Sequence, residues 1–168
     1  MLTAIRKRLT HDEEQGFTLI ELMVVVLIIA ILIAIAIPTF LGARSRSQNR
    51  AAQSNLRNAL AAEKTIYTDA EAYQSAATAG DIQKLKDVEP SLKWVGAAPA
   101  SGEVQVVVGN VTTGVTQTGA VVCLTTKSAS GTIYSIKDVA VGTNAGTTYS
   151  AAAVATCNDT PLPDTKFP

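Results

Sequence analysis

The chain is poor in the residues from which most active sites are built. Its 168 residues include one His, two Cys and one Trp, and only 5% are aromatic. The single imidazole, His11, precedes a long apolar segment, which excludes a His-based catalytic triad and a multi-His metal site. Lys and Arg number 14, as do Asp and Glu, so the basic excess typical of nucleic-acid-binding domains is missing. We expect no enzyme, no metal site and no cofactor.

The apolar residues are concentrated in one segment. Between Phe17 and Ile37, 19 of 21 residues are apolar, whereas from Pro38 onward 55 of 131 are. As a helix this run is about 31 Å long, which matches the hydrocarbon core of a bilayer. A secretory signal peptide has a shorter apolar region, and a soluble core helix has a polar face. We predict a membrane-spanning helix over residues 17–37, after a charged segment over 1–16.

The helical pattern continues over residues 38–73. Apolar residues recur there at spacings of three and four, which predicts a helix face packed on another element. This predicted stripe consists of Ala52, Leu56, Ala59, Leu60, Ile66, Tyr67, Ala70 and Tyr73. A row spaced by seven is expected to face solvent: Arg50, Arg57, Lys64 and Glu71. Pro38 removes a backbone donor and clashes with the preceding turn, so we expect a kink there.

Residues 74–168 are predicted to form a globular head. Three β-rich segments, 103–108, 120–126 and 132–139, are separated by turn residues and predict an antiparallel sheet of three to four strands. The fold class is therefore α+β. A short helix is expected near 82–88, Trp94 is expected to anchor the connecting loop on the sheet, and the tail from Asn158 is expected to be irregular and held near Cys157.

Cys123 and Cys157 lie in a region rich in Thr, Ser and Gly, which has an extracytoplasmic character and could hold one disulfide. Two buried free thiols are the alternative. Basic residues flank the apolar run on both sides, so charge does not orient it in a membrane. A disulfide favours an extracytoplasmic C-terminal region.

The stretch from Gly16 to Glu21 reads GFTLIE and continues as LMVVVLIIAILIAIAIP. It resembles the type IV pilin superfamily, in which a leader ending in Gly is followed by Phe-Thr-Leu-Ile-Glu and a hydrophobic helix. The resemblance is close over residues 16–40. It implies the pilin fold, with a long N-terminal helix that is kinked near Pro38 and packed on the C-terminal sheet.

The resemblance also implies processing and partners. A prepilin peptidase would cleave between Gly16 and Phe17, and Phe17 would be N-methylated. The subunit would leave the cytoplasmic membrane, where its N-terminus lies inside, and enter a helical homopolymer on the cell surface. An assembly ATPase and a membrane platform protein would drive this step. The filament would serve adhesion, motility or DNA uptake.

Glu21 is the one charged residue inside the apolar run. A carboxylate costs roughly 2.5 to 3.5 kcal/mol at a bilayer centre, and less near the end of a span. Interfacial snorkelling explains its presence without a specific role. Our hypothesis is that Glu21 attracts the α-amino group of Phe17 in a neighbouring subunit and sets the axial register between helices.

Other functions stay open at this point. A major pseudopilin of a type II secretion system fits the N-terminal motif, although the cysteine pair and the lack of a calcium loop argue against it. A DNA-binding pilin would use a basic cluster, Arg44, Arg46, Arg50 and Arg57. A membrane-tethered extracytoplasmic binding domain or enzyme leaves the GFTLIE motif unexplained.

Two minor patterns have a simpler explanation as polar turns. The glycosylation acceptor pattern occurs at Asn110 and at Asn158. Asn158, Asp159 and Asp164 carry oxygen ligands of the kind that calcium prefers, but their spacing matches no calcium loop.

Overall fold

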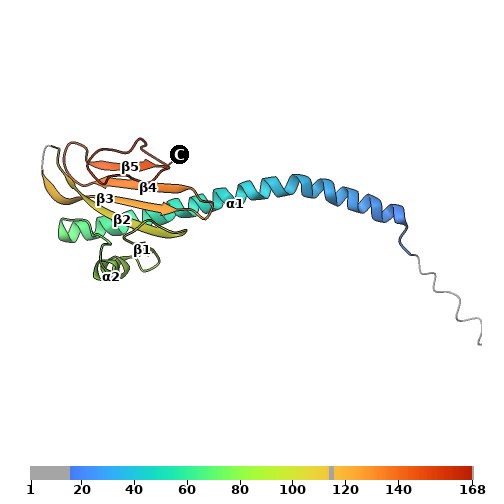
Figure 1. The fold of residues 1–168 in the computed structure, drawn as a ribbon, viewed down its shortest axis with the longest axis horizontal. Coiled ribbons are helices and arrows are strands. Elements are labelled where there is room, and N and C mark those ends of the chain that lie inside the picture. The colour runs from blue at the N-terminus through green and yellow to red at the C-terminus, as the bar shows by residue number, and fades with distance from the viewer. Residues whose placement is uncertain (1–15, 114–115, 168) are drawn as a thin grey trace, which may run out of the picture. The chain divides into compact units, whose positions relative to one another are not determined.

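A computed structural model describes residues 16–113 and 116–167. The chain divides into two compact units, residues 1–42 and 43–168, and one helix, α1 (Leu19–Ala70), runs from the first into the second (Figure 1). The predicted leader, with His11, lies outside the described residues except for Gly16.

The helix begins two residues after its predicted start at Phe17 and ends three before its predicted end at Tyr73. The end has a local cause, since Glu71 takes a left-handed conformation with φ of 55° that stops helical hydrogen bonding. The Tyr73 amide then donates to the Gly119 carbonyl at 2.8 Å, which commits the chain to the sheet. The helix continues through Pro38, and the kink stays a prediction.

The second unit contains a five-stranded sheet in the order β1-β2-β3-β4-β5. Its elements are α2 (Ala79–Val88), β1 (Lys93–Val95), β2 (Glu103–Val111), β3 (Gln117–Lys127), β4 (Ile133–Val139) and β5 (Gly146–Ser150). β1 pairs with β2 in parallel, and the other neighbours are antiparallel. The α+β class, the short helix and the three central strands are confirmed.

The prediction of three to four strands was wrong in number, since the sheet has five, and the predicted antiparallel direction holds for every neighbouring pair except β1 with β2. β1 has three residues between prolines, too few to show an alternating pattern, and its sequence reads KWV. β5 reads GTTYS, which lacks aliphatic residues and resembles a polar connector. Both edge strands are defined by their neighbours in space, so the local sequence does not reveal them.

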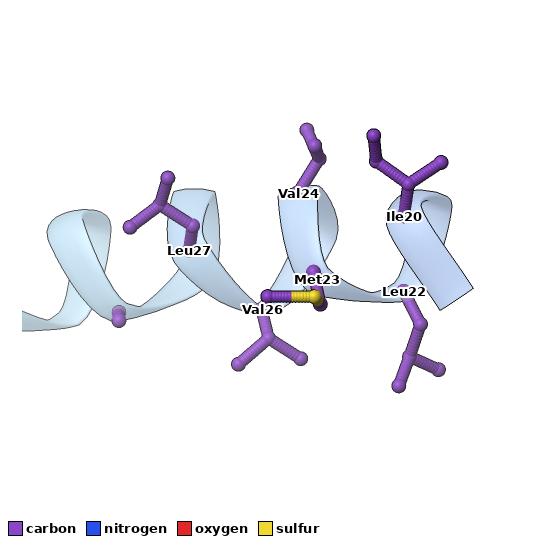
Figure 2. Close-up of a pocket in the computed structure, with 7 residues that line it drawn as sticks. Ile20, Leu22, Met23, Val24, Val26 and Leu27 are labelled. Atoms are coloured by element: carbon purple, nitrogen blue, oxygen red, sulfur yellow. The ribbon is translucent and has the colours of Figure 1, made fainter. Parts of the chain in front are cut away.

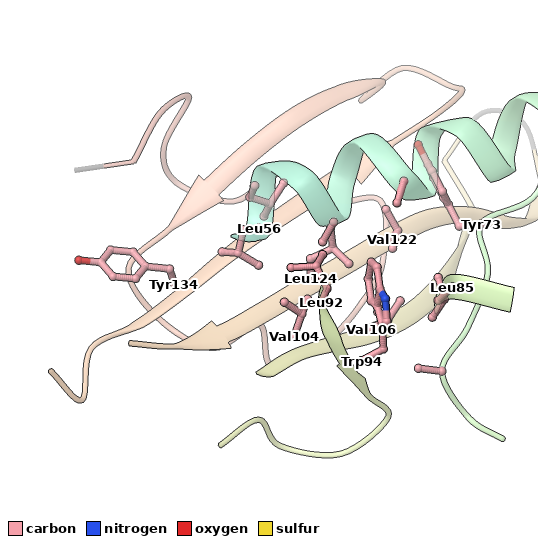
Figure 3. Packing of buried hydrophobic residues seen from close by; sticks show 14 of the residues in the cluster. Leu56, Tyr73, Leu85, Leu92, Trp94, Val104, Val106, Val122, Leu124 and Tyr134 are labelled. Carbon is pink, nitrogen blue, oxygen red and sulfur yellow. The ribbon is translucent and has the colours of Figure 1, made fainter. Parts of the chain in front are cut away.

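One face of the sheet holds the main core (Figure 3). Leu56 and Ala59 of α1 are fully buried there, and strand residues such as Val122 and Leu124 lie in the same cluster. Trp94 is 3% exposed and its indole donates to the Glu89 carbonyl at 3.1 Å, which confirms its role as an anchor. The predicted stripe holds for most positions, but Ala70 is exposed and Glu63 is buried in the same row.

The other face is covered by the C-terminal segment. Cys123 and Cys157 form a disulfide with a Cα–Cα distance of 5.7 Å, which confirms the pairing over two free thiols. A Cβ at Gly109 would lie 2.0 Å from the Cys157 carbonyl oxygen, so β2 accepts this close approach only with glycine. The buried Lys137 ammonium donates to the carbonyls of Thr156 (3.3 Å) and Thr160 (2.9 Å).

The tail is irregular as predicted, but it is also held at β5 and not only near Cys157. Asp164 pairs with Tyr149 of β5 through two backbone hydrogen bonds of 2.8 and 3.2 Å. The Phe167 ring packs against Tyr149 and Tyr134, with centroid distances of 4.8 and 5.7 Å. The chain end therefore closes the β5 edge of the sheet.

Candidate functional site

The first unit presents apolar side chains on all sides of α1. Its large apolar residues from Phe17 to Leu41 are between 47% and 84% exposed. The side chains of Ile20 and Val24 point to one side of the helix, and those of Leu22 and Val26 point to the opposite side (Figure 2). By length and composition, α1 is the helix among the described residues that is able to cross a membrane. A surface of this kind needs lipid or other protein chains to cover it.

Thr18 and Glu21 form a reciprocal cap at the start of α1. The Thr18 hydroxyl accepts a hydrogen bond from the Glu21 amide at 3.3 Å. Oε2 of Glu21 accepts from the Thr18 amide at 3.0 Å and from its hydroxyl at 2.7 Å. The sequence analysis missed this capping box, although Thr-x-x-Glu before an apolar run is its usual signal. Oε1 of Glu21 has no hydrogen bond within the described residues, so one carboxylate oxygen is left to accept another donor.

Gly16 and Phe17 precede the helix and are both exposed. A Cβ at Gly16 would meet no described atom within 4 Å. Sterics among the described residues therefore do not require glycine at this position. The bond between Gly16 and Phe17 lies in a non-helical stretch, where an enzyme reaches the backbone without unwinding a helix.

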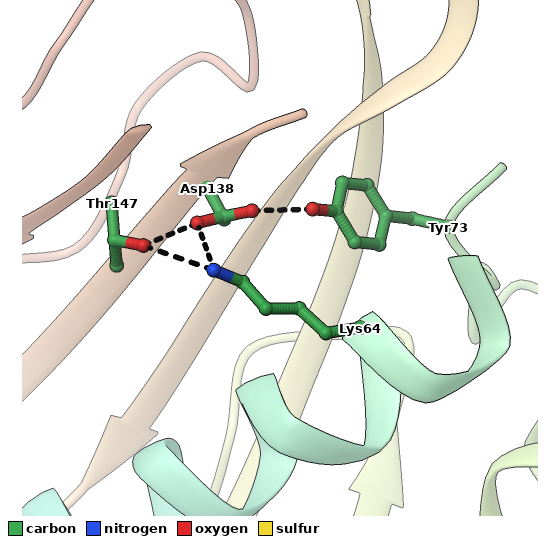
Figure 4. Close-up of polar contacts among 4 residues, drawn as sticks. All are labelled: Lys64, Tyr73, Asp138 and Thr147. Carbon is green, nitrogen blue, oxygen red and sulfur yellow. Dashed lines mark hydrogen bonds and ion pairs between the residues drawn. The ribbon is translucent and has the colours of Figure 1, made fainter. Parts of the chain in front are cut away.

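A polar network joins α1 to β4 and β5 (Figure 4). Asp138 accepts hydrogen bonds from Tyr73 and Thr147 and pairs with the Lys64 ammonium at 3.0 Å. Burial, and the hydrogen bond to the Asp138 carboxylate, raise the pKa of the Tyr73 hydroxyl well above its usual range. Lys64 was predicted to face solvent; it is half exposed and belongs to this network. The groups satisfy one another, which marks the network as structural.

Glu63 is fully buried in α1. Oε2 accepts from the Gln74 amide at 3.0 Å, while Oε1 has no partner in the part of the chain that the structure describes. Burial raises the pKa of Glu63 to about 8, against the opposing effect of the Gln74 hydrogen bond. The side chain is therefore mostly neutral at pH 7. The sequence analysis missed Glu63, although it follows Leu56 and Ala59 at helical spacing.

The minor patterns have local roles. Oδ1 of Asn110 accepts from the Gly119 amide at 3.0 Å, and Oδ1 of Asn158 accepts from the Thr160 amide at 3.2 Å and the Lys137 ammonium at 3.3 Å. The Asp159 carboxylate accepts from two amides of the β2–β3 connection, those of Thr112 and Thr113. The Thr113 side chain, and then these backbone amides, lower the pKa of Asp159. Within residues 16–113 and 116–167, no group of three or more His, Cys, Asp or Glu is placed to hold a metal ion.

Comparison with known proteins gives matches to parts of the chain. Residues 13–37 match the family model described as a prokaryotic N-terminal methylation motif. The chain is 46% identical over 67 residues to the type IV major pilin protein PilA of Myxococcus xanthus, which covers 40% of this chain and 30% of that protein. It is 41% identical over 61 residues to the type IV wide pilus major component PilA4 of Thermus thermophilus, covering 36% and 47% respectively.

The matched segment therefore spans less than half the length of either relative. No solved structure matches the chain significantly. The family model covers residues 13–37, and the alignment to each relative covers less than half of this chain.

Proposed function

We propose that this chain, whose residues 13–37 carry a prokaryotic N-terminal methylation motif, is the structural subunit of a type IV pilus. The observation that carries the proposal is that the part of α1 within that motif is apolar and has no polar face. Both relatives are named as major pilus components. Their names favour a pilus subunit over a secretion pseudopilin and over a tethered binding domain.

Maturation would occur in the non-helical stretch before α1. Cleavage between Gly16 and Phe17 removes residues 1–16, and N-methylation then modifies Phe17. The exposure of both residues supports access by a membrane prepilin peptidase. Before assembly the segment 17–37 would anchor the precursor in the cytoplasmic membrane with its N-terminus inside, and afterwards it would form the filament core, followed by the amphipathic segment 38–73 and the head 74–168.

Assembly would exchange lipid contacts for contacts between copies of α1. Because lipid tails are as apolar as Leu, this exchange has little hydrophobic driving force, and helix packing and ion pairing decide it. An assembly ATPase and a membrane platform protein would supply the work. The head-to-tail contact repeats without closing and so generates a fibre.

Glu21 would pair with the α-amino group of Phe17 in the next copy. Its Oε2 is occupied by Thr18, whereas Oε1 is free within the described residues and would accept the ammonium. The cap fixes the side chain before assembly, which lowers the entropy lost when the pair forms. In an apolar filament core this pair would neutralise two charges that are costly when separate.

The proposed function is tested on filaments sheared from the cell surface. We expect electron microscopy to show thin fibres, and mass spectrometry to identify their subunit as a chain that starts with N-methyl-Phe17. A monomeric membrane protein that retains Met1 would contradict both the processing and the polymer.

The role of Glu21 is tested by two substitutions. Glu21→Gln keeps a capping side chain but removes the charge, whereas Glu21→Ala removes both. We expect both variants to be cleaved at Gly16 and to give at least about tenfold less filament, since an unpaired ammonium is left in the core. If Glu21→Gln assembles as well as the wild type while Glu21→Ala does not, the cap alone explains why assembly needs this side chain, and the proposed ion pair is wrong.

A further inference from the structure

The part of α1 that follows the apolar run has an unbalanced charge. Residues 22–62 contain four Arg and no Asp or Glu. Among the described residues, the ion pair formed by a basic side chain of α1 is that of Lys64 with Asp138. The arginines of this stretch are exposed and have no acidic partner in the described part of the chain, so they are available to an anion from outside.

Two of these arginines line a hollow of about 180 Å³ in the second unit. Its lining consists of Arg46, Asn49, Arg50 and Gln53 from α1 and Tyr134 from β4. The spacing of three, four and seven residues places the α1 members on one face of the helix. The hollow is thus built from two elements that the fold fixes relative to each other.

The lining is rich in hydrogen-bond donors. Each guanidinium carries five N–H groups and accepts none, and the Tyr134 hydroxyl has no partner within the described residues. The Ser130 hydroxyl donates to Oδ1 of Asn49 at 2.5 Å, and the Asn49 NH₂ group has no acceptor among the described residues. Two guanidinium groups, an amide and a hydroxyl suit the oxygens of a phosphate.

The position in the chain identifies the source of that phosphate. Exposed large apolar residues extend four positions beyond the predicted span 17–37, to Leu41, and Arg46 follows five residues later. Five helical residues span about 7 Å, and each headgroup layer of a bilayer is of similar depth, roughly 5 to 8 Å. When the apolar residues up to Leu41 lie in hydrocarbon, as a tilted helix of about 25 residues allows, the chain therefore brings Arg46 to headgroup depth.

We propose that Arg46, Arg50 and the donors beside them bind the phosphate of a phospholipid headgroup in the membrane leaflet next to residues 43–168. This inference rests on the proposed membrane-anchored precursor. The site holds the unassembled subunit at a fixed depth, and the subunit leaves the lipid when it enters a filament. DNA is the weaker fit, because Arg57 lies over the Phe167 ring at 5.2 Å and does not extend the pair into a basic stripe.

The test is a titration of the full chain in neutral detergent micelles, followed by nuclear magnetic resonance of the arginine side-chain N–H groups. The ligands are short-chain phosphatidylglycerol, inorganic phosphate and a DNA duplex. We expect phosphatidylglycerol to shift the Arg46 and Arg50 signals saturably. The R46Q/R50Q variant should bind at least about tenfold more weakly, because it loses two charge-assisted contacts.

The matched control is K84Q/K86Q, which removes the same charge from exposed positions of α2. We expect it to bind within about twofold of the wild type, since it leaves the hollow intact. Trp94 fluorescence verifies that each variant keeps a folded head.

Five outcomes overturn the inference, and four of them come from the titrations: no saturable shift in the wild type, equal weakening in both double variants, inorganic phosphate as effective as the lipid, or tighter binding of DNA. Arg46 and Arg50 signals that shift instead on self-association at high concentration would assign the hollow to an acidic group of a second copy, and this also overturns it. Filaments that begin with N-methyl-Phe17, observed together with any of these results, would leave the proposed function standing.

Discussion

The two ends of α1 use apolar side chains in opposite ways. Leu27 is 61% exposed, whereas Leu56 is fully buried against the sheet. Around Leu27 the apolar residues are large and surround the helix, while the buried row near Leu56 includes Ala52, Ala59 and Ala62, which let the helix approach the strands closely. The second end stabilises the head. The first end stabilises nothing within the described chain, so its apolar surface has to be explained by what binds to it.

The carboxyl groups of the two ends differ in the same sense. Glu21 is exposed, has a cap as its partner and keeps one oxygen free. Glu63 is buried and keeps one oxygen without a partner, which disfavours its charged form. The free oxygen of Glu21 is available to another molecule. The free oxygen of Glu63 is buried, so the head becomes less stable when the Glu63 carboxyl group ionises.

The largest expected effect is the pH dependence that Glu63 imposes on the head. Its pKa is raised from 4.5 to about 8 in the folded state, so the folded state retains a proton that the unfolded chain releases. This stabilising contribution is present below pH 4.5 and is lost as the pH rises to 8, a change of up to about 5 kcal/mol. We expect Glu63→Gln to remove this loss and to be more stable than the wild type at pH 9.

Urea unfolding of the full chain in detergent micelles, followed by Trp94 fluorescence at pH 5, 7 and 9, measures this effect. Glu71→Gln, which removes an exposed carboxyl group from the end of α1, is the matched control. If the unfolding free energy changes equally with pH in the wild type and in Glu63→Gln, Glu63 does not titrate between pH 5 and 9.

What could be predicted from the sequence follows the same division. The apolar run and its motif were evident because a long uniform segment needs no knowledge of its neighbours. β1 and β5 were missed because strand pairing depends on residues far away in the chain, such as the Asp164 that pairs with Tyr149. The position of Glu63 on the buried face follows from its helical spacing after Leu56 and Ala59, but its partner, the Gln74 amide, lies beyond the helix. The Thr18 cap was present in the local sequence and could have been found there. The hollow beside Tyr134 requires β4 to lie next to α1, which no local pattern gives.

The disulfide gives the next largest effect, again confined to the head. Cys123 and Cys157 are 34 residues apart, and the chain-entropy estimate for a loop of this size is about 3 to 4 kcal/mol. We expect the free energy of unfolding of the head to fall by that amount in the C123S/C157S variant, so that it unfolds at a lower urea concentration. The segment 17–37 should still partition into membranes. A variant that loses membrane partitioning as well would couple the two regions, contrary to the comparison.

A pair of identical substitutions tests the comparison at single residues. Leu56→Ala should cost about 3 kcal/mol, because it leaves a cavity under the sheet. Leu27→Ala should change the unfolding free energy of the head by less than about 0.5 kcal/mol, since Leu27 has no buried contacts to lose. Urea unfolding of both variants in micelles measures the difference. Similar values for the two substitutions would mean that the apolar end of α1 contributes to the core of the head.

The smallest effect concerns two caps with the same geometry. Thr78 and Asp81 start α2 with the reciprocal hydrogen bonds that Thr18 and Glu21 make at α1, and the Thr78 hydroxyl lowers the pKa of Asp81. Thr78→Ala should destabilise the head by about 1 kcal/mol, and Thr78→Ser should restore most of it.

Thr18→Ala should leave the unfolding of the head unchanged, because the first turn of α1 lies in the other unit. Its effect should appear as faster amide exchange at the first turn of α1 in micelles and as less filament, since Glu21 then loses the partner that orients it. Thr18→Ser is the control that keeps the hydroxyl. If Thr18→Ala and Thr18→Ser give equal filament yields, the orientation of Glu21 by Thr18 does not matter for assembly. The free carboxylate oxygen alone then accounts for the role of Glu21.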